Sequence, residues 1–183
     1  DLEKRLRDVL KESDENIEEL RRELREVLKE SEDNVKKLAE ENKEVTDRLR
    51  EEIKRLKEED VRKDLVEEVR RRLERISEEN KKTLDDVKKE SKKLVDEVEK
   101  TLRDVKRESE RLARDLERKK DKISKEEIER VIRELKDLNR RLNEELKRAI
   151  KRIKELNKRL NELSKRSIDE LRRLVEELER RVK

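Results

Sequence analysis

An eighteen-residue repeat constrains this chain more than any other feature of its sequence. The segments 2–19, 20–37 and 38–55 align without gaps, and apolar residues recur at the same place in each. These recurring residues include Leu2, Leu20 and Leu38, and likewise Val9, Val27 and Val45. Eighteen residues make about five turns of α-helix, so the apolar stripe returns to the same face without drift. The repeat therefore predicts straight helices with little or no supercoil.

The balance of charged and apolar residues predicts few, long helices around a narrow core. Of the 183 residues, 61% are charged and 28% are apolar, which excludes a conventional globular domain. Such a charge content is typical of disordered chains, but these lack a sustained apolar period. An apolar fraction near two residues in seven is typical of the seam of a coiled-coil-like bundle.

The chain is built from only eleven residue types. Gly, Pro, Cys, Met, His, Phe, Trp, Tyr and Gln are all absent. Without cysteine there is no disulfide framework, and because no apolar run exceeds two residues we expect no membrane span or signal-peptide core. Selection has no physical reason to avoid turn formers and aromatics together, whereas a designer who wants strong helix formers and simple core rotamers does.

Two short breaks divide the periodic pattern into three helices. We expect these helices at about residues 2–58, 61–120 and 124–182. Because the connections are short, consecutive helices should be antiparallel. The fold prediction is an all-α, up-down-up three-helix bundle that forms a single elongated domain over residues 1–183, about 90 Å long at about 1.5 Å per residue.

Both breaks carry candidate helix caps. Asp60 is the expected N-cap of the second helix, because its carboxylate can accept hydrogen bonds from the first backbone N–H groups. At the second break, Ser124 and Glu127 have the spacing of a capping box, in which each side chain bonds the backbone of the other residue. Ile123 and Ile128 should pack on each other as a hydrophobic staple.

An antiparallel register can be tested by arithmetic. With breaks centred near residues 61 and 122, facing residue numbers should sum to about 122 between the first two helices and to about 244 between the last two. This register predicts two leucine layers, Leu20 with Leu102 and Leu142, and Leu38 with Leu84 and Leu160. It also predicts that two small residues face one large residue, Ser13 and Ser109 facing Leu135, and Ser31 and Ser91 facing Ile153.

The same register brings polar residues together inside the bundle. Asn42, Asn80 and Ser164 should meet in one layer, where we expect them to bond one another and to fix the register, as a buried Asn does in coiled coils. A small polar ligand is the alternative for this layer. Ser77 should meet Ser167 one turn away. Asn139 and Asn157 recur at eighteen residues, and the sequence leaves open whether they are buried.

No residue constellation in the sequence points to catalysis or to ligand binding. Metal sites would have to rely on carboxylates alone, and the serines at core spacing have no histidine to activate them. Phosphate binding lacks a Gly-rich loop, and the basic runs are interleaved with acidic residues and lack aromatics for nucleic-acid stacking. Each apolar stripe has a partner stripe, which disfavours membrane-surface binding. We expect no catalytic, cofactor or metal residues, no cofactor, and no nucleic-acid, membrane or small-molecule partner.

At this point the chain resembles de novo designed proteins, specifically the parametrically generated, untwisted antiparallel three-helix bundles made as hyperstable scaffolds. The repeat, the two short breaks, the LKES units at 10–13 and 28–31 and the charge-saturated surface carry this resemblance. It implies a monomeric structural scaffold with no natural biochemical function. The competing hypothesis is a coiled-coil rod that acts as a protein–protein interaction or spacer module.

Overall fold

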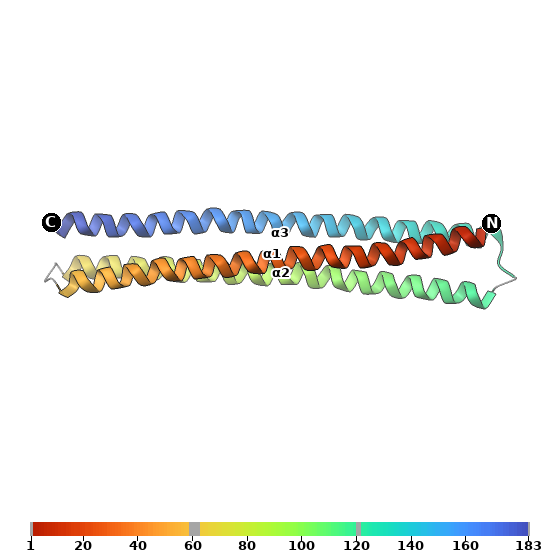
Figure 1. The fold of residues 1–183 in the computed structure, drawn as a ribbon, viewed down its shortest axis with the longest axis horizontal. Helices are drawn as coiled ribbons and strands as arrows, with labels where there is room; N and C mark the ends of the chain where they lie inside the picture. The colour runs from red at the N-terminus through yellow and green to blue at the C-terminus, as the bar shows by residue number, and fades with distance from the viewer. Residues whose placement is uncertain (1, 59–62, 120–121, 183) are drawn as a thin grey trace. The chain divides into compact units, whose positions relative to one another are not determined.

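The computed structural model describes residues 2–58, 63–119 and 122–182. These residues form three long helices and the short segment 122–124 that leads into the third. Helix α1 spans Leu2–Glu58, α2 spans Lys63–Lys119 and α3 spans Lys125–Val182, and they pack against one another (Figure 1). The predicted all-α three-helix bundle is confirmed, and the predicted helix bounds are correct to within two residues. The predicted cap Asp60 lies outside the described residues.

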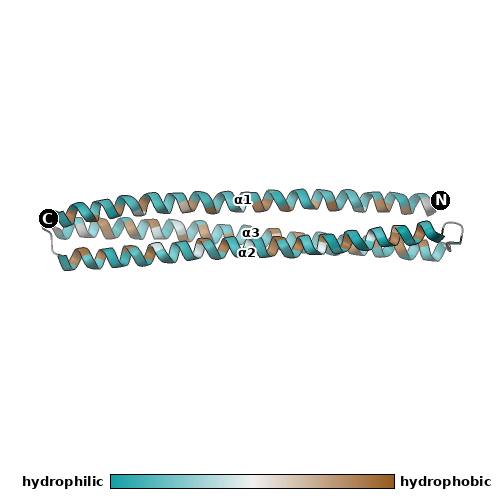
Figure 2. Ribbon diagram, turned by 90° about the horizontal axis from the view of Figure 1, so that it is seen from below, coloured by the Kyte–Doolittle hydropathy of each residue, from teal (hydrophilic) through white to brown (hydrophobic). Residues whose placement is uncertain are grey.

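The apolar stripe explains why these segments are helical and how they pack. Figure 2 shows apolar patches that recur at short intervals along each otherwise hydrophilic helix. The buried residues follow the same spacing, as in the run Leu20, Leu24 and Leu135, Leu142, Leu146. A helix with such an apolar stripe is stabilised mainly by burial of the stripe against neighbouring helices, because intrinsic helix propensity alone contributes little to its stability.

The chain divides into two compact units, and each takes a segment from all three helices. Unit 1 comprises Asp1–Lys29 and Lys92–Ile153, and unit 2 comprises Glu30–Ser91 and Lys154–Lys183. The prediction of one domain over residues 1–183 stays a prediction.

Contacts within unit 2 fix the helix directions. Ser31 of α1 bonds Ser91 of α2, whereas Arg50, further along α1, bonds Glu74, which precedes Ser91. Helix α2 is therefore antiparallel to α1, as the colours of Figure 1 also show. Asn34 bonds Asn157 of α3, and Asn42, further along α1, bonds Ser164, so α3 runs in the same direction as α1. The Ser31–Ser91 pair also has the expected residue sum of 122.

Unit 1 has two apolar clusters in its core. The first contains Leu6, Leu112, Ile128, Val131, Ile132 and Leu135. The second contains Ile17, Leu20, Leu24, Val95, Val98, Leu102, Val105, Leu142, Leu146, Ala149 and Ile153. The predicted layer of Leu20, Leu102 and Leu142 is thus brought into one cluster, where Leu102 and Leu142 are fully buried.

Unit 2 has one large apolar cluster near the end of α1. It contains Leu49, Ile53, Leu56, Val66, Val69, Leu73, Ile76, Leu171, Leu174 and Val175. All three leucines of the other predicted layer, Leu38, Leu84 and Leu160, are also buried in this unit. The core therefore consists of residues at the positions that the repeat assigns to it.

The start of α3 has half of the predicted capping box. The Glu127 backbone N–H donates to Ser124 Oγ at 3.2 Å, which confirms Ser124 as the N-cap. Ile123 packs against the cluster that contains Ile128, as the staple requires. The predicted reciprocal bond from Glu127 is wrong, because its carboxylate lies 3.7 Å from Lys119 Nζ at the end of α2.

Candidate functional site

The polar residues inside unit 1 join α1 to α3. The Asn16 side-chain amide donates to Asn139 Oδ1 at 3.1 Å, and the Ser13 hydroxyl donates to the same oxygen at 3.4 Å. Asn139 in turn donates from Nδ2 to the Leu135 carbonyl at 2.9 Å. Ser13 is fully buried, whereas Asn16 and Asn139 are half-buried. We call Ser13, Asn16, Asn139 and the buried Ser109 of α2 the first Ser/Asn cluster.

Unit 2 contains a second Ser/Asn cluster, formed by Ser31, Asn34, Ser91 and Asn157. Asn34 Nδ2 donates to Asn157 Oδ1, and Asn157 Nδ2 donates to Ser31 Oγ, both at 2.9 Å. The Ser31 hydroxyl then donates to Ser91 Oγ at 3.4 Å. Asn157 is half-buried, like Asn139, which answers the question that the sequence left open. This chain of bonds connects all three helices.

The two clusters are related residue by residue through the eighteen-residue repeat, yet their hydrogen bonds differ. Ser31 accepts from Asn157 and is free to donate to Ser91. Ser13 instead donates to Asn139, and the Ser109 hydroxyl is left without a hydrogen-bond partner within the described part of the chain. A buried hydroxyl without a partner is a cost to folding, because it has lost its bonds to water.

This difference predicts opposite effects for two matched substitutions. Ser91→Ala should lower the free energy of unfolding by about 0.5–1.5 kcal/mol, because it removes a bonded hydroxyl. Ser109→Ala should raise it by about 1 kcal/mol, because it removes an unpaired one. Both variants gain the same helix propensity, so the difference between their guanidinium unfolding curves isolates the hydroxyl effect. Equal stability of the two variants would contradict the bonding difference.

Two of the three residues of the predicted layer, Asn42 and Ser164, form a bonded pair. Ser164 Oγ donates to Asn42 Oδ1 at 3.5 Å, and both residues are buried. Asn80 is half-buried and makes no side-chain hydrogen bond in the part of the chain that the structure describes. The expectation that all three bond one another is therefore confirmed for one pair only. Ser77 and Ser167 are both half-buried.

An open groove of about 490 Å³ follows α1 and α3 over the first Ser/Asn cluster. Four of its lining residues, Ser13, Asn16, Asn139 and Asn143, have uncharged polar side chains. The groove is lined by Val9, Glu12, Ser13, Asn16, Lys136, Asn139, Arg140, Asn143, Glu144 and Lys147. The amides of Asn16 and Asn139 are engaged with each other, so the groove is the exposed side of a helix-pairing contact.

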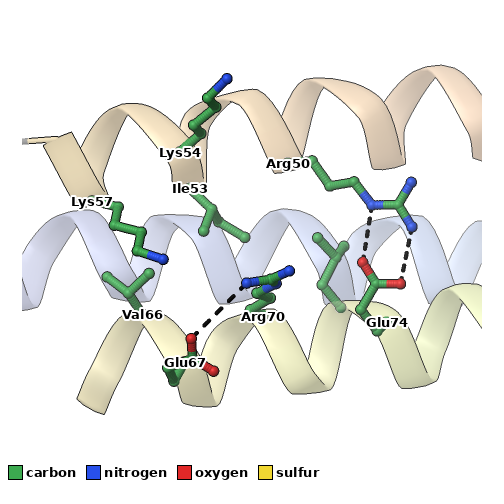
Figure 3. A pocket seen from close by; sticks show the side chains of 9 residues that line it. Arg50, Ile53, Lys54, Lys57, Val66, Glu67, Arg70 and Glu74 are labelled. Carbon is green, nitrogen blue, oxygen red and sulfur yellow. Dashed lines mark hydrogen bonds and ion pairs between the residues drawn. The ribbon is translucent and has the colours of Figure 1, made fainter. Parts of the chain in front are cut away.

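A second hollow of about 350 Å³ lies between α1 and α2 in unit 2 (Figure 3). Arg50 reaches from α1 to α2 and bonds the Glu74 carboxylate with two nitrogens, each at 3.0 Å. This bidentate bond raises the pKa of Arg50. Glu67 lies 4.0 Å from Arg70 on the same helix. Of these two pairs, the Arg50–Glu74 bond joins α1 to α2, and the Glu67–Arg70 pair lies along α2.

Two glutamates meet between α1 and α3 near the end of unit 2. A side-chain hydrogen bond to Glu179 raises the pKa of Glu52, and burial and the charge of Glu179 act in the same direction. Arg55, 4.0 Å from Glu52, opposes the shift. Sequence reasoning missed this pair. The repeat gave no signal for it, because the partners of Asn16 and Asn34 on α3 recur at Val175 and not at Glu179.

The raised pKa of Glu52 predicts a pH-dependent contribution to stability. The contribution is fully present below the unfolded pKa of about 4.3 and is lost as the pH rises through the folded value, because the pair then carries two negative charges. Glu52→Gln should therefore raise the free energy of unfolding at pH 7 by about 0.2–1 kcal/mol, and by less at pH 3. Glu51→Gln, at an exposed neighbour, is the control and should show a smaller change at pH 7. Guanidinium unfolding of both variants at the two pH values measures this, and a larger effect at pH 3 would refute it.

The described residues contain no group of three His, Cys, Asp or Glu side chains that could hold a metal ion. Within the same residues, no helix has an apolar stretch of the length needed to cross a membrane. No protein-family model, curated protein or solved structure matches this chain.

Proposed function

We propose that this chain is a designed structural scaffold, a hyperstable monomeric three-helix bundle without a biochemical activity of its own. The observation that carries the proposal is the use of its core polar groups. In both Ser/Asn clusters, side chains that could have formed a site are bonded to the neighbouring helix. These groups specify how the helices pair, which is the task of buried polar residues in coiled coils.

The composition supports the same proposal. Strong helix formers dominate the sequence, and the residues absent from it are those that bend helices or offer reactive, metal-binding or stacking side chains. The repeat of whole Ser/Asn clusters at an interval of five helical turns is consistent with helices that were laid out with little supercoil.

High thermal stability is expected from this architecture. Each helix has a continuous apolar stripe buried against its neighbours, and intrinsic propensity opposes it little. The thermal midpoint of unfolding should exceed about 90 °C. Circular dichroism at 222 nm between 20 and 95 °C measures this, and a cooperative transition near about 55 °C would overturn the expectation of hyperstability.

Mass measurement separates the proposal from its main alternative. Light scattering coupled to gel filtration should give a monomer of 22.5 kDa at every concentration from about 5 to 500 μM. A coiled-coil rod that pairs with other chains should give a mass that rises with concentration, and this result would favour an interaction or spacer module.

A further inference from the structure

One type of core layer occurs three times along the bundle at eighteen-residue intervals. In the first two repeats it is apolar, and in the third it is polar. The first two layers are Leu6, Leu116 and Ile128, and Leu24, Val98 and Leu146. The third layer contains the bonded pair Asn42 and Ser164, and the repeat assigns Asn80 of α2 to it, eighteen residues before Val98. The third repeat thus departs from the other two at a position where the geometry accepts leucine and valine.

A second type of layer departs in the opposite sense. Its first two copies belong to the Ser/Asn clusters, and its third copy is apolar. The polar copies are Ser13, Ser109 and Asn139, and Ser31, Ser91 and Asn157. The apolar copy is Leu49, Leu73 and Val175, which lie together in the apolar cluster of unit 2. The polarity of both layer types is therefore inverted in the third repeat.

Because the first two repeats are alike, two copies of the chain could pair in a wrong register. Helix α1 of one copy could meet α3 of another with an offset of eighteen residues, so that Ser31 and Asn34 would meet Asn139. Within one chain this offset is barred. Eighteen helical residues span about 27 Å, whereas a connection of four or five residues reaches about 18 Å at most, so α2 cannot keep its register with one neighbour while the other neighbour shifts by eighteen residues. Only helices from separate chains can adopt the offset.

We propose that the inverted polarity of the third repeat is a specificity device that prevents staggered association with a second copy of this chain. In the staggered pair, Asn42 of one copy would face Leu146 of the other, and Asn157 would face Leu49. Each mismatch buries an amide against an apolar side chain, which leaves its hydrogen bonds unmade. A staggered contact is open-ended and would propagate into filaments, so its exclusion keeps the chain monomeric. The inference rests on the proposed monomeric scaffold and names the residues that maintain it.

The test replaces polar residues of the third layer so that this layer matches the second. A disulfide between two copies then captures the staggered register. Glu52 interacts with Glu179 in the native register, so Asn161, eighteen residues before Glu179, is the residue that Glu52 would approach in the staggered register. Copies carrying Glu52→Cys are mixed with copies carrying Asn161→Cys, unfolded together, refolded and oxidised. The chain has no cysteine of its own, so disulfides form only between the introduced cysteines, and peptide mapping separates the 52–161 dimer from the 52–52 and 161–161 dimers.

The Asn42→Leu/Ser164→Leu background should raise the yield of the 52–161 disulfide dimer at least about fivefold over the native background. An equal yield in both backgrounds would overturn the inference. Asn42→Ala/Ser164→Ala removes the same polar groups with smaller side chains and should also raise the yield, which covers the case in which the leucine pair fails to fold.

Two controls separate a change of register from a general increase in hydrophobic association. Mixing Glu52→Cys with Glu179→Cys copies reports exchange in the native register, and its yield should not differ between backgrounds. Asn16→Leu/Asn139→Leu adds similar apolar area but makes the first two repeats less alike, so the 52–161 yield should stay at the native level. A rise with this variant equal to that of the Asn42→Leu/Ser164→Leu pair would assign the effect to apolar area and refute the inference. A native chain that is already oligomeric would instead refute the proposed monomeric scaffold.

Discussion

Leu135→Ala is expected to lower the free energy of unfolding by about 2–5 kcal/mol, one of the largest effects of any single substitution in this chain. The Leu135 side chain is fully buried in the first apolar cluster of unit 1. Truncation removes buried methyl groups and leaves a cavity that the packed helices close only in part. Leu163→Ala is the matched control on the same helix, because Leu163 is 47% exposed.

Guanidinium unfolding at 25 °C measures both leucine variants. The control should change the free energy of unfolding by less than about 1 kcal/mol, since an exposed side chain loses little burial. Similar losses for the two variants would mean that the core at Leu135 is loosely packed.

The polar layer of unit 2 gives the second large effect, and its direction is stabilising. Asn42→Leu, Asn80→Val and Ser164→Leu together reproduce the layer of Leu24, Val98 and Leu146 one repeat earlier. That layer is 1–2% exposed, so the backbone geometry accepts these side chains. Burial of two leucines and a valine in place of polar groups should raise the free energy of unfolding by about 2–4 kcal/mol.

The single variant Asn42→Leu is the informative comparison for the triple one. It should be less stable than the triple variant by about 1–3 kcal/mol, because the buried Ser164 hydroxyl loses its acceptor. Guanidinium unfolding at low protein concentration compares them. If the triple variant proved less stable than the native chain, the equivalence of the two layers would be wrong.

The fold could be read from the sequence because every level of the pattern agrees. The eighteen-residue period assigns Leu20, Leu102 and Leu142 to the core, the two breaks set the register, and the structure places these residues in one cluster. Helix bounds followed from the same pattern. The start of α3 was predictable from Ser124, because a cap depends on local spacing alone.

Contacts that depend on side-chain rotamers were less predictable. Asn16 and Asn34 received no role from the sequence, although each lies three residues after a buried serine and bonds an asparagine of α3. Asn80 falls in the predicted layer by register but its amide bonds neither Asn42 nor Ser164. Register arithmetic fixes the height of a residue along the bundle, whereas its angle around the helix decides whether it reaches a neighbour.

The Glu127 carboxylate shows a further limit of local reasoning. The capping-box pattern assigns it to the Ser124 backbone, yet the end of α2 supplies Lys119 as a charged competitor. Similarly, the Glu52–Glu179 pair is hidden by composition, because 54 acidic residues make any one pair unremarkable in the sequence.

The residue-by-residue equivalence of the two Ser/Asn clusters makes the length of this protein adjustable in fixed steps. Removing residues 13–30, 92–109 and 135–152 would delete one repeat from each helix and would bring chemically equivalent neighbours together at every junction. Each helix would become about 27 Å shorter, and the second Ser/Asn cluster would remain to pair the helices. Inserting the same segments once more would lengthen each helix by the same step. The length of the bundle can thus be changed in steps of about 27 Å, one repeat at a time.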